Sequence, residues 1–334
     1  MSTSVLTWGL IKFTTRRRWL DIPVERSAHR QPMPSAGGVA MLVPFLVGLV
    51  LFFLGGRIEL PTLLIFAGCL VMALIGLVDD LHPLAIRWRL PFQFASALWI
   101  LGWAGVLPSL QLAGWRVENP LLINGVAVLS FVWLLNLFNF MDGIDGLAAT
   151  ETSYVTLLSC LLAITANDQP IFSMSALTGA VALGFLVWNW APAKIFMGDA
   201  GSSFLGYCLG ALAITSLANG TMNPWSWLLL LGVFVVDATY TLLYRILSGQ
   251  RWYEGHSSHA YQHAARLLGS HRRINLLVLA VNLLWLAPLA WLANNHQSTG
   301  LILTVVGLIP LVLLARWLGA GTTPVGQMGM RESV

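Results

Sequence analysis

The sequence predicts an all-α, polytopic integral membrane protein with about ten full transmembrane helices and a short apolar segment near its N-terminus. Apolar residues make up 57% of the 334 residues, charged residues only 10%, and the mean hydropathy is +0.75. Soluble domains carry roughly 25% charged residues, so this composition excludes an ordinary soluble protein. A second observation is a series of apolar stretches close to the length of about 20 residues that a helix needs to cross a bilayer. The chain is therefore expected to form a single transmembrane domain, 1–334.

The predicted spans follow one another with short polar connections. In order they are 38–54, 61–78, 91–107, 121–138, 147–165, 172–188, 201–217, 226–243, 274–292 and 300–318. The segment 5–13 is apolar but too short for a full span, and the basic cluster 16–18 follows it. A signal peptide would place its positive charge first, so we expect a shortened first transmembrane helix, or one that lies in the interface.

Basic residues are distributed unevenly between the two sides of the predicted bundle. Of the 18 lysines and arginines, only Arg57 and Arg116 fall on one side, and the other 16 share the opposite side. Because basic loops tend to stay in the cytoplasm, the side with 16 is predicted to be cytoplasmic. The net charge of +4 is then a topology signal and an attraction for anionic lipid or phosphate. It does not imply a nucleic-acid partner.

The segment 142–146, Asp-Gly-Ile-Asp-Gly, interrupts two apolar runs where a span meets the predicted cytoplasm. It supplies the carboxylates of Asp142 and Asp145, and Asn136 and Asn139 precede it on the same stretch. Charge is costly beside hydrocarbon, so ionisable residues in this position are functional by default, and glycine lets a ligand approach closely. The alternative is a solvated turn between two helices.

Asp79 and Asp80 end the predicted span 61–78 on the same side. Adjacent carboxylates repel each other unless a cation lies nearby, and oxygen ligands of this kind suit Mg²⁺ together with substrate phosphates. One of the two could instead act as a general base. The alternative is an acidic pair at a helix end, neutralised by Arg87 or Arg89.

Asp199 lies in a third acidic cluster, just before the predicted span 201–217. A helix start rich in glycine and serine offers free N–H groups and a positive dipole end, which favour phosphate. Because a bare phosphate would repel Asp199, this residue is expected to be a metal ligand. Lys194 adds a point charge for a phosphoryl group. An ordinary helix cap is the alternative.

The loop 244–273 carries His256 and His259, which share a face if this segment is helical. Zinc binding is not favoured because the loop has no cysteine, so recognition of phosphate and base is predicted. A solvated basic loop is the alternative. Arg26 and His29 lie in the first basic loop, where basic residues can do no more than set the topology.

Asp237 lies within the predicted span 226–243 and needs a partner there; contact between helices and catalysis both remain open. The three acidic clusters lie at span ends, whereas a transporter places its ionisable residues near the midplane. An enzyme that joins a cytosolic phosphorylated substrate to a membrane lipid is therefore favoured, with a lipid or solute transporter as the alternative from another class. An intramembrane Mg-dependent prenyltransferase would need aspartate at position 83 to complete Asp-Asp-x-x-Asp, and Pro83 is there.

Five motifs, in this order, resemble those of the polyprenyl-phosphate N-acetylhexosamine-1-phosphate transferases. They are Arg26-x-x-His29 followed by Pro34 and Gly37-Gly38; Asp79-Asp80; Asn136-x-x-Asn139-x-x-Asp142-Gly-x-Asp145-Gly; Lys194-x-Phe-Met-Gly-Asp199-x-Gly-Ser; and His256-x-x-His259. Any one of them is weak evidence, but five in order are highly specific. The form of the last motif is most similar to the branch that initiates O-antigen in Gram-negative bacteria.

The resemblance implies a reaction and a place for it. An N-acetylaminosugar 1-phosphate would pass from a UDP-sugar to undecaprenyl phosphate, giving undecaprenyl-diphospho-sugar and UMP, with Mg²⁺ as cofactor and Mn²⁺ as an alternative metal. This step would initiate the synthesis of O-antigen in lipopolysaccharide, or of a related cell-envelope or cell-wall polymer, at the cytoplasmic face of the bacterial inner membrane. The sequence does not choose among GlcNAc, FucNAc, QuiNAc and GalNAc as donor sugar, and it leaves a homodimer open.

Motif positions carry the expected roles over to this chain. The expected active-site loops are 14–37, 79–90, 136–146, 189–203 and 244–273. The expected catalytic residues are Asp79, Asp80, Asp142 and Asp199, with Asp79 as candidate base and with Asp79, Asp80 and Asp199 at the metal. The expected substrate-binding residues are Arg26, His29, Asn136, Asn139, Asp145, Lys194, His256 and His259.

Overall fold

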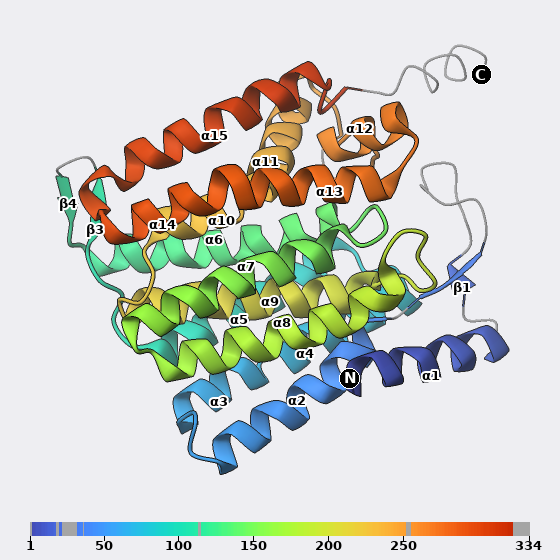
Figure 1. Cartoon of the computed structure of the whole chain (residues 1–334), viewed down its shortest axis with the longest axis horizontal. Helices are drawn as coiled ribbons and strands as arrows, with labels where there is room; N and C mark the ends of the chain where they lie inside the picture. Colours follow the sequence, from blue (N-terminus) through green and yellow to red (C-terminus); the bar gives the residue numbers. More distant parts are fainter. Residues whose placement is uncertain are drawn as a thin grey trace.

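The computed structural model describes residues 2–17, 20–21, 32–35, 37–112, 115–251 and 255–322. It confirms the all-helical fold class, because helices packed side by side account for nearly all of the described elements (Figure 1). The elements of the first half are α1 Ser2–Arg17, β1 Leu20–Asp21, β2 Met33–Pro34, α2 Gly38–Leu54, α3 Leu60–Ala67, α4 Cys69–Leu81, α5 Ile86–Ala104, β3 Leu110–Leu112, β4 Trp115–Val117, α6 Pro120–Met141 and α7 Leu147–Ala166. Those of the second half are α8 Gln169–Asn189, α9 Gly198–Ala218, α10 Pro224–Leu230, α11 Gly232–Leu247, α12 Ala260–Leu268, α13 His271–Val281, a π-helix Asn282–Leu286, α14 Ala287–Asn295, a 3₁₀-helix Gln297–Thr299 and α15 Gly300–Trp317. Of the described strands, β1 pairs with β2 and β3 with β4, both antiparallel.

The predicted count of ten spans is not confirmed. Among the described residues, seven helical segments are long and apolar enough to cross a membrane, which makes this a multi-pass membrane protein: Leu60–Leu81, Pro120–Met141, Leu147–Ala166, Gln169–Asn189, Gly198–Ala218, His271–Asn295 and Gln297–Trp317. The other predicted spans are helical but irregular. α2 is a shorter apolar helix, α5 begins with two arginines, and the span predicted at 226–243 is bent by 80° between α10 and α11.

Helix α9 is the centre of the bundle. In its apolar window 89% of residues are buried, against 22% for the outermost span Gln297–Trp317. The buried small residues of α9 are Ala200, Gly201, Ser202, Ser203, Gly206, Gly210 and Ala211. Small side chains let helix backbones approach closely in a membrane, and α2, α4, α6 and α8 all pack against α9. The first turn of α9, which carries Asp199, is thereby held at the middle of one end of the bundle.

The polar loops with the sequence motifs gather at this end, which we call the motif end: the α6–α7 loop, the α8–α9 loop and α12. Figure 1 shows them at one end of the bundle, with the α2–α3 turn and the β3–β4 pair at the opposite end. Arg57 lies in that turn and Arg116 in β4. The two basic residues that the sequence set apart from the rest therefore do lie apart from the motif end.

Candidate active site

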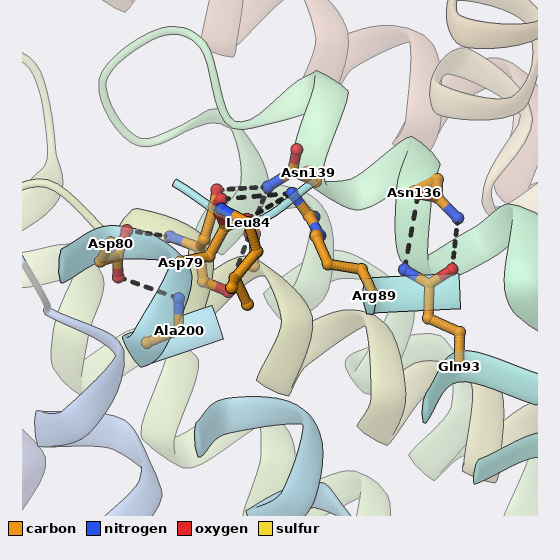
Figure 2. Close-up of polar contacts among 10 residues, drawn as sticks. Asp79, Asp80, Leu84, Arg89, Gln93, Asn136, Asn139 and Ala200 are labelled. Carbon is orange, nitrogen blue, oxygen red and sulfur yellow. Dashed lines mark hydrogen bonds and ion pairs between the residues drawn. The ribbon is translucent and has the colours of Figure 1, made fainter. Parts of the chain in front are cut away.

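Asp80 lies in the last turn of α4 and its carboxylate faces the first turn of α9 (Figure 2). Oδ1 accepts the backbone N–H of Asp199 at 2.7 Å, and Oδ2 accepts that of Ala200 at 3.1 Å. Gly198 permits this approach, because its φ is +72° and a Cβ there would lie 2.6 Å from Asp80 Oδ2. The positive end of the α9 dipole thus binds a carboxylate of the protein, at a place where the sequence predicted a substrate phosphate.

Asp79 is held by two donors. Its Oδ1 accepts the backbone N–H of Leu84 at 2.6 Å, and its Oδ2 lies 2.5 Å from Nη1 of Arg89 in α5. The same Nη1 lies 3.5 Å from Oδ2 of Asp199. Arg89 therefore bridges carboxylates from α4 and α9, a role that the sequence offered only as a neutralising alternative. The sequence does contain one indication of this role of Arg89. The connection 82–85 is so short that α4 and α5 must be neighbours.

Asn139 and Asn136 lie one turn apart on α6 but contact different helices. The side-chain amide of Asn139 donates to Asp199 Oδ1 at 2.5 Å and to Ser202 Oγ at 3.3 Å. Asn136 exchanges two hydrogen bonds with Gln93 of α5, at 2.8 and 3.4 Å (Figure 2). Asn139 thus belongs to the acidic site, whereas Asn136 fastens α6 to α5.

Asp142 directly follows α6 and lies among other carboxylates. Burial raises its pKa well above the ordinary value, and the negative charges of Asp199, Asp80 and Asp145 raise it further. Like charges in one site make it costly for every carboxyl to ionise. The motif end therefore concentrates negative charge that a cation would offset.

Asp145 has a separate set of partners. Its Oδ2 accepts the backbone N–H of Ala193 at 3.1 Å and lies 3.4 Å from Nδ1 of His271. Its backbone carbonyl accepts a hydrogen bond from the side chain of Asn275 at 2.7 Å. Asp145 thus ties the α6–α7 loop to the α8–α9 loop and to α13. Sequence reasoning missed His271 and Asn275, which lie one turn apart on one face of a helix.

The intramembrane acid Asp237 anchors the start of α12. Its carboxylate accepts the backbone N–H groups of Ala260 and Tyr261 at 2.9 and 2.8 Å and lies 3.1 Å from Nδ1 of His259. The side chain of His259 is only 4% exposed. In this conformation Asp237 and His259 form a contact between α11 and α12.

His256 stacks on His259 with ring centres 5.0 Å apart, and its Nδ1 lies 3.0 Å from Ser258 Oγ. Burial lowers the pKa of His256 to about 3, and the neighbouring His259 and Arg245 contribute in the same direction. His256 is therefore neutral near pH 7. It can approach a phosphate as a hydrogen-bond donor rather than as a fixed positive charge.

Helix α12 also docks onto the end of α6. The hydroxyl of Tyr261 donates to the backbone carbonyl of Phe140 at 2.9 Å, and the ring of Phe140 stacks on His259 at 6.0 Å. Only Met141 separates Phe140 from Asp142, so the segment with His256 and His259 packs against the same end of α6 that leads into the acidic site.

The remaining predicted residues lie elsewhere or cannot be placed. Lys194 is exposed, and its Nζ lies 5.1 Å from the ring centre of Trp188. Arg26 and His29 lie outside the described residues.

The carboxylate ligands at this site suit a cation that also binds a substrate. In the part of the chain that the structure describes, no group of three or more His, Cys, Asp or Glu side chains could by itself hold a metal ion. Mg²⁺, however, is usually bound by one or two carboxylates together with phosphates and waters. Asp79 and Asp199, which share Arg89 as a partner, provide two such carboxylates, and Asn139 orients one of them. The residues present therefore fit Mg²⁺ bound with a diphosphate.

Comparison with known proteins identifies related sequences. The sequence profile described as glycosyl transferase family 4 matches residues 62–217, which run from α3 to the end of α9. A probable undecaprenyl-phosphate N-acetylglucosaminyl 1-phosphate transferase of Bacillus subtilis is 30% identical over 264 residues, covering 78% of this chain and 73% of the relative. A phospho-N-acetylmuramoyl-pentapeptide-transferase of Moorella thermoacetica is 33% identical over 237 residues (65% and 71%). A decaprenyl-phosphate N-acetylglucosaminephosphotransferase of Mycolicibacterium smegmatis is 28% identical over 329 residues (87% and 80%).

Proposed function

This chain belongs to glycosyl transferase family 4, and on that basis we propose that it transfers an N-acetylaminosugar 1-phosphate from a UDP-sugar to undecaprenyl phosphate. An oxygen of the lipid phosphate attacks the phosphorus next to the sugar, and the bond from that phosphorus to the bridging oxygen breaks. The products are undecaprenyl-diphospho-sugar and UMP. The reaction takes place on the cytoplasmic side of the bacterial inner membrane and initiates O-antigen or another cell-envelope polysaccharide.

The observation that carries this proposal is the convergence of carboxylates from three helix ends at the motif end. Asp79 and Asp80 end α4, Asp142 follows α6, and Asp199 begins α9. A cytosolic nucleotide diphosphate and a lipid phosphate can meet where apolar helix surfaces end. When bound, Mg²⁺ neutralises charge on the diphosphate and makes the phosphorus easier to attack.

Asp199 and Asp79 hold the cation in this proposal. The side chain of Asp199 is 32% exposed, and Asn139 fixes one of its oxygens. The side chain of Asp79 is 7% exposed and accepts from Leu84 and Arg89. Because a general base must reach the proton that it removes, this enclosed position suits a metal ligand better than a base. Asp142, which directly follows α6 near Asp80 and Asp199, is the candidate for taking a proton from the lipid phosphate once a bound cation lowers its raised pKa and leaves it ionised.

Purified protein supplied with undecaprenyl phosphate, Mg²⁺ and labelled UDP-sugars tests the proposal. Two of the three relatives above are named for N-acetylglucosamine, so UDP-GlcNAc is the first donor, followed by UDP-GalNAc, UDP-FucNAc, UDP-QuiNAc and the muramoyl-pentapeptide donor. We expect UMP and lipid-linked label in equal amounts, with both lost after chelation of the metal or in Asp199→Asn. A prenyltransferase, which needs a prenyl diphosphate as substrate, would release no UMP from these components, and neither would a transporter. Failure of every donor to yield UMP would overturn the proposal.

A further inference from the structure

Arg89 occupies the position between the two carboxylates that best suit a cation. Its Nη1 atom lies 2.5 Å from Oδ2 of Asp79 and 3.5 Å from Oδ2 of Asp199 (Figure 2). The Arg89 side chain is 19% exposed and that of Asp79 only 7%. A single positive group is thus enclosed with two carboxylates that come from different helices.

Among the described residues, two further basic side chains of the predicted site loops contact aromatic rings. Arg87, two residues earlier on α5, is exposed and lies over the ring of Trp88, with its guanidinium carbon 6.0 Å from the ring centre. Lys194 lies over the ring of Trp188. Of the ion pairs that the described residues show for Asp79 and Asp199, all are made with Arg89.

Mg²⁺ binds its oxygen ligands at about 2.0–2.1 Å and with strict geometry. A guanidinium at 2.5 Å from Asp79 Oδ2 and a divalent cation on the same oxygen would repel each other strongly at that separation. The two positive groups therefore exclude each other from the shared carboxylates.

We propose that Arg89 is a built-in competitor of the divalent cation: it must leave Asp79 and Asp199 before the cation can bind them. This inference rests on the proposed metal-dependent transfer. It predicts weak cation binding by the protein alone. It also predicts that the diphosphate of the donor strengthens cation binding, because its negative charge draws Arg89 away from the carboxylates as well as supplying ligands.

The experiment is a titration of purified protein with Mn²⁺, monitored by the electron paramagnetic resonance signal of the free ion, without any donor. Arg89→Met should bind Mn²⁺ more tightly by on the order of tenfold or more, because it removes a unit charge within a few ångströms of the ion. The matched control is Arg87→Met, which makes the same substitution two residues away and should change the affinity by less than about twofold, because exposed charges are screened. Arg89→Lys, which keeps the charge, should stay near the unmodified protein.

A second titration, in the presence of UDP, measures how strongly UDP binding and Mn²⁺ binding affect each other. In the unmodified protein UDP should strengthen Mn²⁺ binding, and by linkage Mn²⁺ should strengthen UDP binding by the same factor. In Arg89→Met this factor should be smaller, because no arginine remains to be displaced. If UDP strengthened Mn²⁺ binding by the same factor in both proteins, the effect of UDP would not act through Arg89.

Unchanged or weaker Mn²⁺ binding in Arg89→Met would overturn the inference. If that variant is not monodisperse, Arg89→Gln replaces it, with the same expected direction. The titration needs no turnover, so its outcome is separate from that of the UMP assay. If the unmodified protein releases UMP while Arg89→Met shows no gain in Mn²⁺ affinity, only the role of Arg89 fails.

Discussion

At the scale of single residues, the two neighbouring aspartates of α4 differ in what they contact. Asp80 accepts two backbone N–H groups from the start of α9, whereas Asp79 contacts Arg89 and a backbone N–H of its own loop. From the sequence, both were expected at the metal, with Asp79 also as the candidate base. In the structure, Asp80 is the residue that positions Asp199, and Asp79 is the one that shares Arg89 with it.

This difference predicts that Asp80→Asn loses stability as well as activity. A carboxylate can accept from two adjacent N–H groups, whereas an amide has one oxygen and would turn its NH₂ toward the second donor. The cost should be about 1–2 kcal/mol, as for loss of a helix N-cap, measured as a lower melting temperature of the purified protein. The matched control is Glu118→Gln, because Glu118 is exposed and pairs with Arg116 at 3.2 Å at the opposite end. Equal melting temperatures for the two variants would contradict the capping role of Asp80.

At the scale of elements, the position of α12 depends on a close contact with the α6–α7 loop. The Tyr261 hydroxyl donates to the Phe140 carbonyl and lies so near Gly143 that a Cβ at this glycine would collide with it. Gly143 is therefore required by the approach of α12, in addition to any contact with a ligand. The contact brings the segment with His256 and His259 close to the carboxylates at the ends of α4, α6 and α9.

A pair of substitutions tests this contact. Gly143→Ala should lower stability by about 1–3 kcal/mol, as overpacking commonly does, and should reduce turnover. Adding Tyr261→Phe removes the colliding oxygen, so the double variant should recover part of the loss although Tyr261→Phe alone costs about 1 kcal/mol for its hydrogen bond. Melting temperature and UMP release of the three variants give the coupling energy. Gly125→Ala, in α6 with open space around it, is the control, and strictly additive effects would disprove the contact.

At the scale of the whole molecule, the bundle has two chemically different ends. The motif end carries the acidic site and the histidine segment, whereas the opposite end carries Arg57 and Arg116 beside the α2–α3 turn and the β3–β4 pair (Figure 1). Basic residues are retained on the cytoplasmic side of a membrane. A donor made in the cytosol would also have to reach the motif end from there.

The predicted orientation can be measured with introduced cysteines. Arg116→Cys should react with an impermeant thiol reagent in right-side-out vesicles, and Arg87→Cys only in inside-out vesicles. Both positions are exposed, so accessibility of the side chain does not decide the result. Cys69 and Cys208 are buried and Cys160 is partly buried, and the unmodified protein measures their background. The reverse labelling pattern would place the motif end outside the cytoplasm.

Much of the fold followed from the sequence, and the exceptions have physical causes. Arg87 and Arg89 at the start of α5 lower the hydropathy of that segment, and Arg89 is retained there as the partner of Asp79. The span at 226–243 reads as one apolar run, yet α10 and α11 meet at 80°. Hydropathy measures preference for lipid over water, and it carries no information about whether an apolar segment forms one straight helix or two helices that meet at an angle.

The candidate site was predicted as a set of residue types rather than as a geometry. Asp79, Asp80, Asn139, Asp142 and Asp199 were all singled out, and the structure brings them to one end. Arg89 was seen only as an alternative partner of the acidic pair, and His271 and Asn275 were not seen. Polar side chains that bind other side chains leave no periodic pattern along the chain.

The sequence by itself determined that this is a helical membrane protein with acidic motifs at span ends, because backbone groups in lipid must be satisfied within each segment and hydropathy alone then specifies helices. Only the tertiary structure decided which groups each acid contacts. The decisive pairs join residues far apart in the chain: 60 positions for Asn139 and Asp199, 119 for Asp80 and the N–H of Asp199, and 121 for Tyr261 and Phe140. The two pairs that involve Asp199 form where small residues on α9 let neighbouring helices approach, and the third forms where α12 packs on α6. Such proximity depends on packing between helices rather than on any one of them.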